Sequence, residues 1–349
     1  MPAETPPRTP LAVRGRTTLR YALSAGLTIF FLWVAFGGTD VDQLILAIRG
    51  ANYWWIGAMV ACLLLSHLVR AWRWRYLLEP IKRGIRIRNL FSGVMVGYLF
   101  NNLLPRAGEL TRPYVIGTLE KISRSSAFGT IVVERIIDTF SFLLLVALLP
   151  FVYSGPLIES FPWLHRAGLM ITAATAGVLL LTVILMVRRD WTNRLLGIFG
   201  VVLPARFARR MEGFVHAFLD GFLFLTRPAN FLLIVAQSAM IWTLYIVMMY
   251  VAFFAFDLGG LGIAAAVVVQ TISSIGVAVP TPGGTGSYHA FASQSLVKLF
   301  GVDPAAALSY ATVTHAAGFI SVSVWGLYFF FRDHVRTSDA LKSQTTEPV

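Results

Sequence analysis

Three ionisable side chains lie inside a long apolar run, and they are the first candidates for chemistry. Glu134, Arg135 and Asp138 occur within "AFGTIVVERIIDTFSFLLLVALLPF". A charge inside a membrane helix costs about 3 kcal/mol on insertion scales, so such charges usually face a cavity and pair with one another. Glu134 and Asp138 are one helical turn apart, and Arg135 can reach Asp138 three residues later. The spacing therefore predicts a paired polar cluster inside the membrane.

More charges follow a Pro-Gly interruption nearer the N-terminus. The segment "NNLLPRAGELTRPYVIG" contributes three of them, and we expect them at a similar depth. Guanidinium groups hold phosphate by paired hydrogen bonds, while carboxylates fix the arginines or exchange protons. Together the two segments predict a site for an anionic headgroup, made of Arg106, Glu109, Arg112, Glu134, Arg135 and Asp138. A purely structural salt-bridge lattice between the segments is the alternative.

A second interruption, "PTPGGTGSYHAF" at residues 280–291, comes straight after an apolar run. Its glycines let the backbone approach a neighbour or a ligand closely, and free N–H groups after a turn can receive an anion. His289 and His315 are candidate proton carriers or, alternatively, satisfied helix–helix hydrogen bonds. We expect both turns to line one cavity, with tight glycine packing as the alternative. The residues assigned to them are Asn101, Asn102, Pro105, Gly108, Pro280, Pro282, Gly283, Gly284, Gly286 and His289.

The composition identifies the class of protein that must position these residues. Of the 349 residues, 56% are apolar and 13% are charged, which predicts an integral membrane protein. The formal net charge of +12 comes from basic residues between the apolar runs, as the positive-inside rule requires, so we expect no nucleic-acid partner. A single cysteine excludes an internal disulfide. "PGGTGS" lacks the lysine of a phosphate-binding loop, and we predict no cofactor and no metal site.

Apolar length defines the predicted helices, because a spanning helix needs about 20 residues. Six runs are long enough, near residues 18–37, 53–78, 126–153, 167–187, 229–256 and 305–331. Two shorter runs, 90–104 and 262–279, each end at a proline, and we assign each to a hairpin that enters the membrane and returns. The predicted fold class is an all-α integral membrane protein with six full transmembrane helices plus two re-entrant helical hairpins.

Basic residues set the predicted orientation. The tail 1–17 and the segment "RAWRWRYLLEPIKRGIRIR" are placed in the cytoplasm, with the aromatic "WRWRY" at the membrane interface. The first hairpin then enters from the cytoplasm and the second from outside. Residues 191–226 are assigned to a cytoplasmic segment, whose 205–226 part either lies on the membrane or links two spans. Both termini, including the tail 332–349, are predicted to be cytoplasmic, and the membrane is the cytoplasmic one.

The single membrane domain 18–331 contains a predicted repeat. The halves, about 53–153 and 229–331, each read span, hairpin, span, and "LLPRAGE" and "AVPTPGG" both place a glycine three positions after a proline. Opposite entry of the hairpins predicts an inverted repeat, a plan shared by many secondary transporters with the site at the bilayer midplane. Chance similarity between two Pro-Gly turns is the alternative.

Three motifs in order and spacing resemble the flippase-like membrane region of lysylphosphatidylglycerol synthases and related integral membrane proteins. They are "NNLLPRAGELTRPYVIG", "SRSSAFGTIVVERIIDTFSFLLL" and "PTPGGTGSYHAF", and the resemblance covers residues 15–335. Many members of that family have a glutamate three residues after the last glycine of the third motif, where this chain has His289. Only a short polar tail follows Phe331, so the resemblance implies no aminoacyl-transferase domain here.

The resemblance and the predicted cluster together imply a lipid flippase or transporter. It would move a lipid with an anionic or polyprenyl-phosphate-linked headgroup between leaflets, with Arg106, Arg112 and Arg135 contacting the headgroup. Membrane lipids are then the expected partners, and enzyme activity is not expected. Two alternatives stay open: an intramembrane transferase acting on a lipid-linked phosphate, with Glu134 or Asp138 as base, and a membrane partner of a separate lipid- or glycan-modifying enzyme. The sequence leaves the oligomeric state open.

Overall fold

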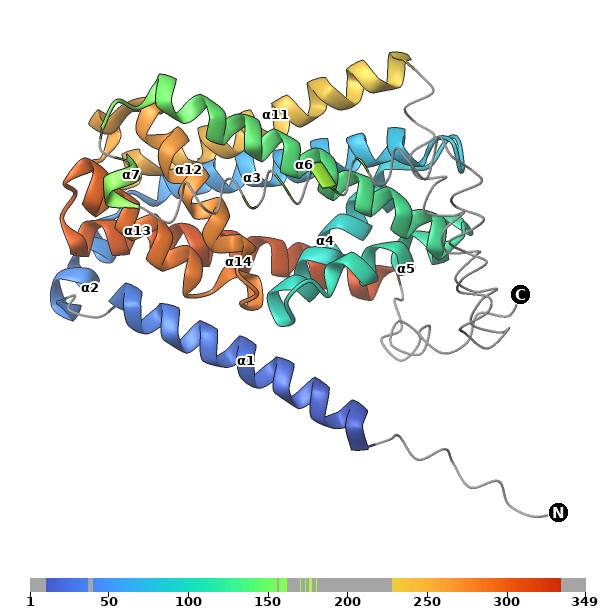
Figure 1. Ribbon diagram of the computed structural model, residues 1–349, viewed down its shortest axis with the longest axis horizontal. Coiled ribbons are helices and arrows are strands. Elements are labelled where there is room, and N and C mark those ends of the chain that lie inside the picture. The colour runs from blue at the N-terminus through green and yellow to red at the C-terminus, as the bar shows by residue number, and fades with distance from the viewer. Residues whose placement is uncertain are drawn as a thin grey trace.

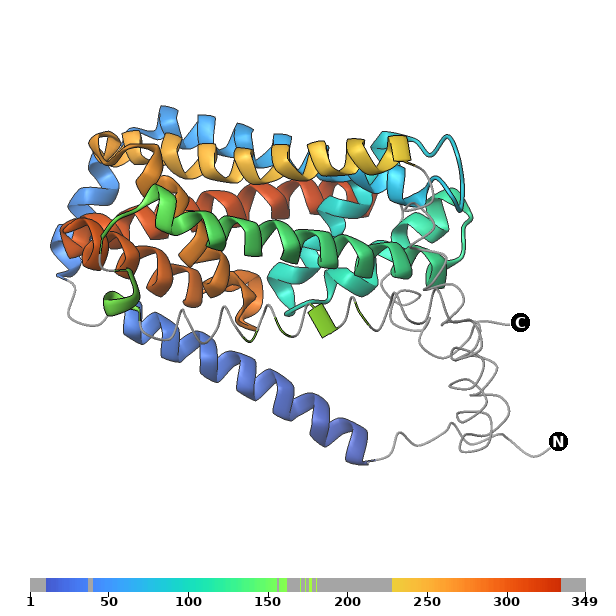
Figure 2. The ribbon, with the colours of Figure 1, turned by 45° about the horizontal axis from the view of Figure 1, so that its top comes forward.

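The computed structural model describes residues 11–36, 40–155, 157–161 and 228–333, together with isolated positions between 170 and 180. These residues form helices and turns, with no strand among them. The longer helices run side by side, and α1 (Leu11–Phe36) lies along one edge of the bundle (Figures 1 and 2). Apart from those isolated positions, the predicted span 167–187 falls outside the described residues, as do the segment 191–226 and the tail beyond Asp333.

Most helices coincide with predicted apolar runs. α3 (Tyr53–Leu78), α6 (Arg124–Val152), α11 (Pro228–Phe253) and α14 (Pro304–Arg332) match the runs 53–78, 126–153, 229–256 and 305–331. α1 begins at Leu11 instead of at 18. The short helices α2 (Val41–Gly50) and α7 (Leu157–Ser160) were not predicted, and Asp40 caps α2 by accepting from the backbone N–H groups of Asp42 and Gln43.

Several helices are long and apolar enough to cross a membrane. Among the described residues there are four: Tyr53–Leu78, Asn230–Phe256, Gly259–Ala278 and Pro304–Arg332. A fifth results if Ala22–Phe36 and Val41–Gly50, which meet at 87°, form one span. The range 259–278 contains α12 (Gly262–Ala278), which we predicted as a hairpin arm, whereas α6 is not among the four. The chain is therefore a multi-pass membrane protein, and the count of six spans stays a prediction.

Each predicted turn joins two helices that pack on each other. α4 (Ile87–Leu103) packs on α5 (Gly108–Glu120), and α12 packs on α13 (Ser287–Phe300). A 3-10 turn, η4 (Pro282–Gly284), separates the second pair. The arms of both hairpins are thus helical as expected, while their re-entry into a membrane and the inverted repeat stay predictions.

Two glycines allow the two helices of the first hairpin to pack closely. A Cβ atom at Gly108 would fall on the carbonyl oxygen of Gly97, and a Cβ atom at Gly97 would fall on the side chain of Arg112. Asn101 Oδ1 also accepts a 2.7 Å hydrogen bond from the Gly108 backbone N–H. The absence of these two side chains lets α5 approach α4 closely and brings Arg112 across the face of α4.

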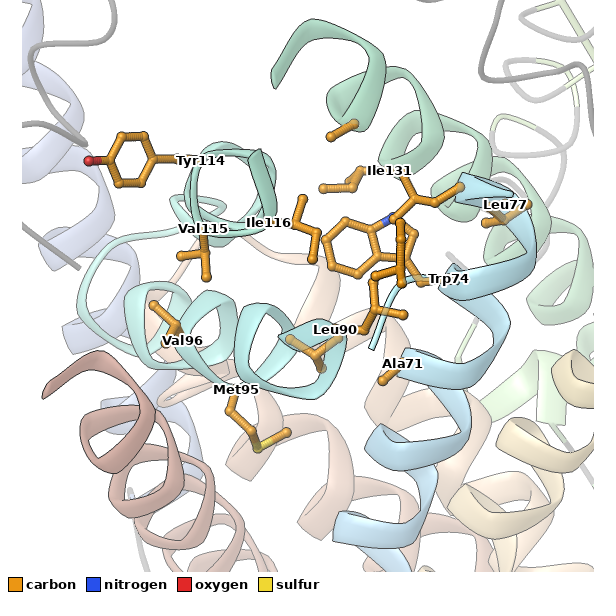
Figure 3. Packing of buried hydrophobic residues seen from close by; sticks show 14 of the residues in the cluster. Ala71, Trp74, Leu77, Leu90, Met95, Val96, Tyr114, Val115, Ile116 and Ile131 are labelled. Carbon is orange, nitrogen blue, oxygen red and sulfur yellow. The ribbon is translucent and has the colours of Figure 1, made fainter. Parts of the chain in front are cut away.

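A buried hydrophobic core fixes four helices against one another. Trp74 of α3 packs with Leu90 of α4, Ile116 of α5 and Ile131 of α6, and all four are almost fully buried (Figure 3). The Trp74 indole Nε1 donates a 2.9 Å hydrogen bond to Thr130 Oγ1 of α6. This core sets the relative rotation of α3, α5 and α6, which carry the charged side chains described next.

The two hairpin turns also meet each other. Asn102 Nδ2, at the end of α4, donates to Ser323 Oγ of α14 at 2.9 Å. A Cβ atom at Gly283 would lie 2.8 Å from Asn102 Oδ1, so the second turn lies directly beside the first. α1 covers the second turn from another side, where Ser24 Oγ donates a 3.0 Å hydrogen bond to the Pro280 carbonyl.

Candidate functional site

Glu134 is the centre of a buried ionic cluster built from α3, α5 and α6. Its side chain has no exposed surface. Oε1 accepts hydrogen bonds from Arg70 Nη1 at 2.6 Å, Arg112 Nη1 at 2.9 Å and Arg135 Nη2 at 2.7 Å, and Oε2 accepts from Arg112 Nη2 at 2.8 Å. The pair with Arg112 is bidentate, which is the geometry that guanidinium and carboxylate groups favour.

Asp138, one turn further along α6, binds the other side of the same cluster. Its oxygens accept from Arg70 Nη1 at 2.7 Å and from Arg73 Nη2 at 2.6 Å, and Arg135 Nη2 lies 3.6 Å away. Arg70 therefore bridges both carboxylates. Arg70 and Arg73 are three residues apart on α3, so both project from one face of that helix toward α6.

Two hydroxyl groups of α11 also bind arginines of the cluster. Arg70 Nη2 donates to Tyr245 Oη at 3.0 Å, and Arg73 Nη1 donates to Ser238 Oγ at 2.9 Å. The face of the Trp74 ring lies 4.3 Å from the guanidinium carbon of Arg112. A guanidinium over an indole face gains a cation–π attraction, which helps a charged group to remain in an apolar core.

The cluster carries more positive than negative charge. Four guanidinium groups, those of Arg70, Arg73, Arg112 and Arg135, surround only the two carboxylates of Glu134 and Asp138. Two positive charges are therefore uncompensated among the described residues. The side chains of Arg70, Arg73 and Arg112 are at most 6% exposed, so water screens this excess poorly. An imbalance of this kind favours an anion as a further partner.

Arginine N–H donors without a hydrogen-bond partner also favour an anion at the cluster. Among the described residues, the Nε atoms of all four arginines are buried and lack a hydrogen-bond partner. A buried donor without a partner usually costs about 1–3 kcal/mol, and more if it is charged. Of the four arginine side chains, only that of Arg135 is substantially exposed, at 42%, so it is the most accessible member of the cluster.

The structure brings together four of the six predicted site residues. Arg112, Glu134, Arg135 and Asp138 are in contact, as the spacing indicated. Arg106 is exposed in the turn before α5, and Glu109 is half-buried in the first turn of α5; neither forms an ion pair with any described residue. Arg106 lies in the turn two residues before α5 begins, at the tip of the hairpin, whereas Arg112 lies within α5.

Sequence reasoning missed Arg70 and Arg73. We assigned both to a cytoplasmic basic segment, with "WRWRY" at the membrane interface, but Arg73 and Trp74 have no exposed surface. Their position inside the apolar run 53–78 could have identified them. Arginines within a predicted span need partners in the same way as the carboxylates Glu134 and Asp138 do. Ser238 and Tyr245 gave no comparable signal, because isolated hydroxyl groups are common in membrane helices.

The second hairpin turn carries no charged side chain, but two histidines lie beside it. Gly283, Gly284 and Gly286 have φ angles of 58°, 75° and 82°, which favour glycine. The Gly286 N–H donates to His289 Nδ1 at 3.2 Å, and His315 Nε2 lies 3.0 Å from the Gly283 carbonyl oxygen. The two imidazole ring centroids are 4.7 Å apart.

The described residues show no group of three or more His, Cys, Asp or Glu side chains that could hold a metal ion. The oxygens of the two cluster carboxylates, Glu134 and Asp138, accept from arginines instead. The chemistry that this arrangement supports best is anion binding.

Comparison with known proteins places the chain among membrane proteins of the same kind. The sequence model described as "Lysylphosphatidylglycerol synthase TM region" matches residues 19–326. A "UPF0104 membrane protein" of Methanothermobacter thermautotrophicus is 29% identical over 272 residues, which cover 73% of this chain and 78% of that protein. A second "UPF0104 membrane protein", of Methanocaldococcus jannaschii, is 30% identical over 121 residues, or 34% of this chain and 36% of its own length.

A more distant relative carries an enzyme name. "Glycosyltransferase AglD" of Haloferax volcanii is 25% identical over 342 residues, which cover 88% of this chain but only 53% of that protein. No solved structure matches the chain. Since the family model covers most of the sequence, the chain belongs to the family of the lysylphosphatidylglycerol synthase transmembrane region.

Proposed function

We propose that the protein is a lipid transporter that moves a lipid with an anionic headgroup between the leaflets of the cytoplasmic membrane. The observation that carries this proposal is the uncompensated double positive charge of the buried cluster. A phosphate-bearing headgroup would supply the missing negative charge and accept from the unpaired Nε donors. A phospholipid and a polyprenyl-phosphate-linked sugar share this chemistry.

The route of the headgroup follows from the hairpins. In this proposal the protein has six spans, cytoplasmic termini and two hairpins that enter from opposite sides as an inverted repeat. The contact between the turns at Asn102 and Gly283 then lies near the bilayer midplane, where such repeats build their sites. Arg135, the most exposed arginine of the cluster, receives the headgroup first, and Arg106 at the first turn guides its approach.

A reconstitution experiment tests transport directly. The purified protein is placed in vesicles of phosphatidylcholine that contain either labelled phosphatidylglycerol or a labelled polyprenyl phosphate. A reagent that cannot cross the membrane then measures how fast the labelled headgroup exchanges between leaflets. Faster exchange of an anionic lipid than of labelled phosphatidylcholine supports the proposal, and the faster of the two anionic lipids identifies the class. Unchanged exchange of all three lipids would exclude transport.

A second candidate function is that of a membrane partner for a glycan-modifying enzyme. It rests on the similarity to AglD, which extends over most of this chain but leaves nearly half of AglD unmatched. A separate enzyme could supply the equivalent of that unmatched part. Stable co-purification with a glycosyltransferase, combined with no lipid exchange in the vesicle experiment, would favour this candidate over the transporter.

A further inference from the structure

The two histidines beside the second hairpin turn, His289 buried and His315 half-buried, have defined hydrogen-bond roles. A backbone N–H only donates, so His289 Nδ1 must accept from Gly286 and the ring hydrogen lies on Nε2. A carbonyl oxygen only accepts, so His315 Nε2 must donate to Gly283. Nδ1 of His315 is therefore the one ring nitrogen of the pair that is free to take up a proton without breaking either bond.

The surroundings of the pair contain aromatic rings and hydroxyl groups instead of charges. The His289 ring centroid lies 6.1 Å from Phe36 of α1, and the His315 centroid lies 5.4 Å from Tyr288 and 6.0 Å from Phe319. Aromatic faces at such distances can hold a cation that lacks an ionic partner. Two protons would put like charges on rings 4.7 Å apart, so the pair would hold at most one proton.

Few other ionisable groups lie near the pair. α12 and the part of α1 from Ala22 to Phe36 contain no titratable side chain at all. α13 contributes Tyr288, whose hydroxyl is 3.0 Å from Thr314 Oγ1, and Lys298 about 13 Å further along the helix. α14 contributes Tyr310, whose hydroxyl donates to the Met249 carbonyl oxygen at 3.2 Å. α2, α3 and α4 also pack on α14, and they carry Asp42, Arg49, His67 and Tyr98. Among the described residues, none of these four side chains contacts either imidazole, and each imidazole is the nearest titratable ring of the other.

The pair lies far from both ends of α14. His315 is the twelfth residue of α14, about 17 Å from the start of that 29-residue helix. The turn that it holds, at Gly283, is the one that touches Asn102 of the first hairpin. The first hairpin in turn carries Arg112, which binds Glu134. A continuous set of contacts therefore joins the histidines to the ionic cluster.

We propose that His289 and His315 form a proton-binding site that couples lipid transport to proton movement. The site binds one proton at His315 Nδ1. The resulting imidazolium strengthens the bond from Nε2–H to the Gly283 carbonyl oxygen and holds the second turn on α14. Loss of the proton weakens that bond and frees the turn to move away from Asn102. The coupling rests on the proposed transport function, and the proton binding itself does not.

Two substitutions separate proton binding from hydrogen bonding. His315→Gln retains an N–H donor at the position of Nε2, and His289→Asn retains an acceptor at the position of Nδ1, but neither side chain titrates. Both variants therefore preserve the bonds to Gly283 and Gly286. They also assign the signals of these two residues among the six histidines of the chain.

The first experiment measures proton binding without transport, by nitrogen-15 NMR of histidine-labelled protein in lipid nanodiscs. At about pH 8 both rings should show the neutral Nε2–H form, and on titration to about pH 5 the His315 Nδ1 signal should shift to that of an imidazolium. In the His289→Asn variant, the pH at the midpoint of the His315 titration should differ from that of the native protein. If neither ring is protonated over this range, or if His315 titrates identically without His289, the proposal is wrong.

The second experiment measures coupling in the vesicles described above. If one proton moves with each lipid, a difference of about one pH unit should hold the lipid at about a tenfold asymmetry between leaflets. A proton ionophore should abolish this asymmetry, and His315→Gln should lack it. If the native protein exchanges lipid but the distribution of the lipid does not depend on the pH difference, the proposed coupling is wrong and the proposed transport function still stands. No lipid exchange at all would instead overturn the transporter, and the NMR titration would still decide proton binding.

Discussion

Arg112 and Glu134 form a two-point ion pair that joins the first hairpin to α6. Arg112 Nη1 and Nη2 donate to the two carboxylate oxygens at 2.9 and 2.8 Å, and both side chains are buried. The residues are 22 positions apart, across a turn and the start of a new helix. This pair therefore transmits any movement of α5 directly to the carboxylate that Arg70 and Arg135 also hold.

Removing one partner of this pair should destabilise the protein strongly. Arg112→Ala removes two hydrogen bonds to the Glu134 carboxylate, leaves Glu134 with Arg70 and Arg135, and opens space beside Trp74, so we expect a loss of about 3 kcal/mol in the free energy of unfolding. Arg112→Lys keeps the charge but loses the second hydrogen bond, and should be intermediate. Denaturation in mixed micelles measures both. Arg106→Ala is the control, because Arg106 is exposed and should change stability by less than about 0.5 kcal/mol.

Substitutions at the contact between Arg73 and Asp138 can change the excess positive charge of the cluster. Arg73→Met lowers the excess from two charges to one, and should weaken the binding of phosphatidylglycerol by at least about tenfold. The double variant Arg73→Met with Asp138→Asn restores an excess of two, and should bind within about threefold of the native protein. Lipid retained through purification, quantified by mass spectrometry, measures this. Equal loss of lipid in both variants would show that Arg73 acts through local geometry and not through the net charge.

Helix positions could be predicted largely from the sequence. The ends of α3, α11 and α14 follow from apolar length alone, and the two Pro-Gly turns mark where α4 and α12 end. Glu134, Arg135 and Asp138 were identifiable because charges within an apolar run must find partners. Local sequence carries that information without reference to the rest of the fold.

The remaining members of the site depend on tertiary packing. Whether Arg73 faces the cytoplasm or α6 depends on the rotation of α3, which the Trp74 core and its bond to Thr130 determine. The contact between Asn102 and Gly283 joins residues far apart in the chain, and nothing local encodes it. Arg106 and Arg112 share a motif, but only Arg112 reaches the cluster because Gly97 makes room for it.

Gly108 should be intolerant of even the smallest side chain. Gly108→Ala places a methyl group on the Gly97 carbonyl oxygen, which forces α5 away from α4 and should cost about 2–3 kcal/mol in the free energy of unfolding. Gly57→Ala in α3 is the matched control, because a Cβ atom there meets nothing within 4 Å. That change should be neutral or stabilise by up to about 1 kcal/mol. Comparable losses in both variants would contradict the close approach of α4 and α5.

Glu120, at the end of the first hairpin, should make stability depend on acid pH. Burial alone would raise the pKa of Glu120, but hydrogen bonds from Lys82 and Asn89, at 2.8 and 2.7 Å, and the charge of Lys82 lower that pKa below its ordinary value of 4.5. The ionised group is therefore stabilised in the folded state. Its contribution is fully present above the unfolded pKa and is lost as the pH falls through the folded pKa.

The midpoint of thermal unfolding of Glu120→Gln should lie below that of the native protein at neutral pH, and the gap should close below pH 4.5. A gap that does not change with pH would assign the effect of the substitution to packing.

The opposite entry of the two hairpins can be tested by cysteine labelling. Lys121 directly follows the return arm α5, and Lys298 lies in the last turn of the return arm α13; both are exposed. The proposed topology therefore places Lys121 in the cytoplasm and Lys298 outside. In a Cys62→Ala background, Lys121→Cys should react with a membrane-impermeant maleimide only after the cells are opened, and Lys298→Cys should react in intact cells. Labelling of both cysteines from the same side would mean that one hairpin crosses the membrane fully. The count of spans would then change, and the two halves of the chain would no longer be related by inversion.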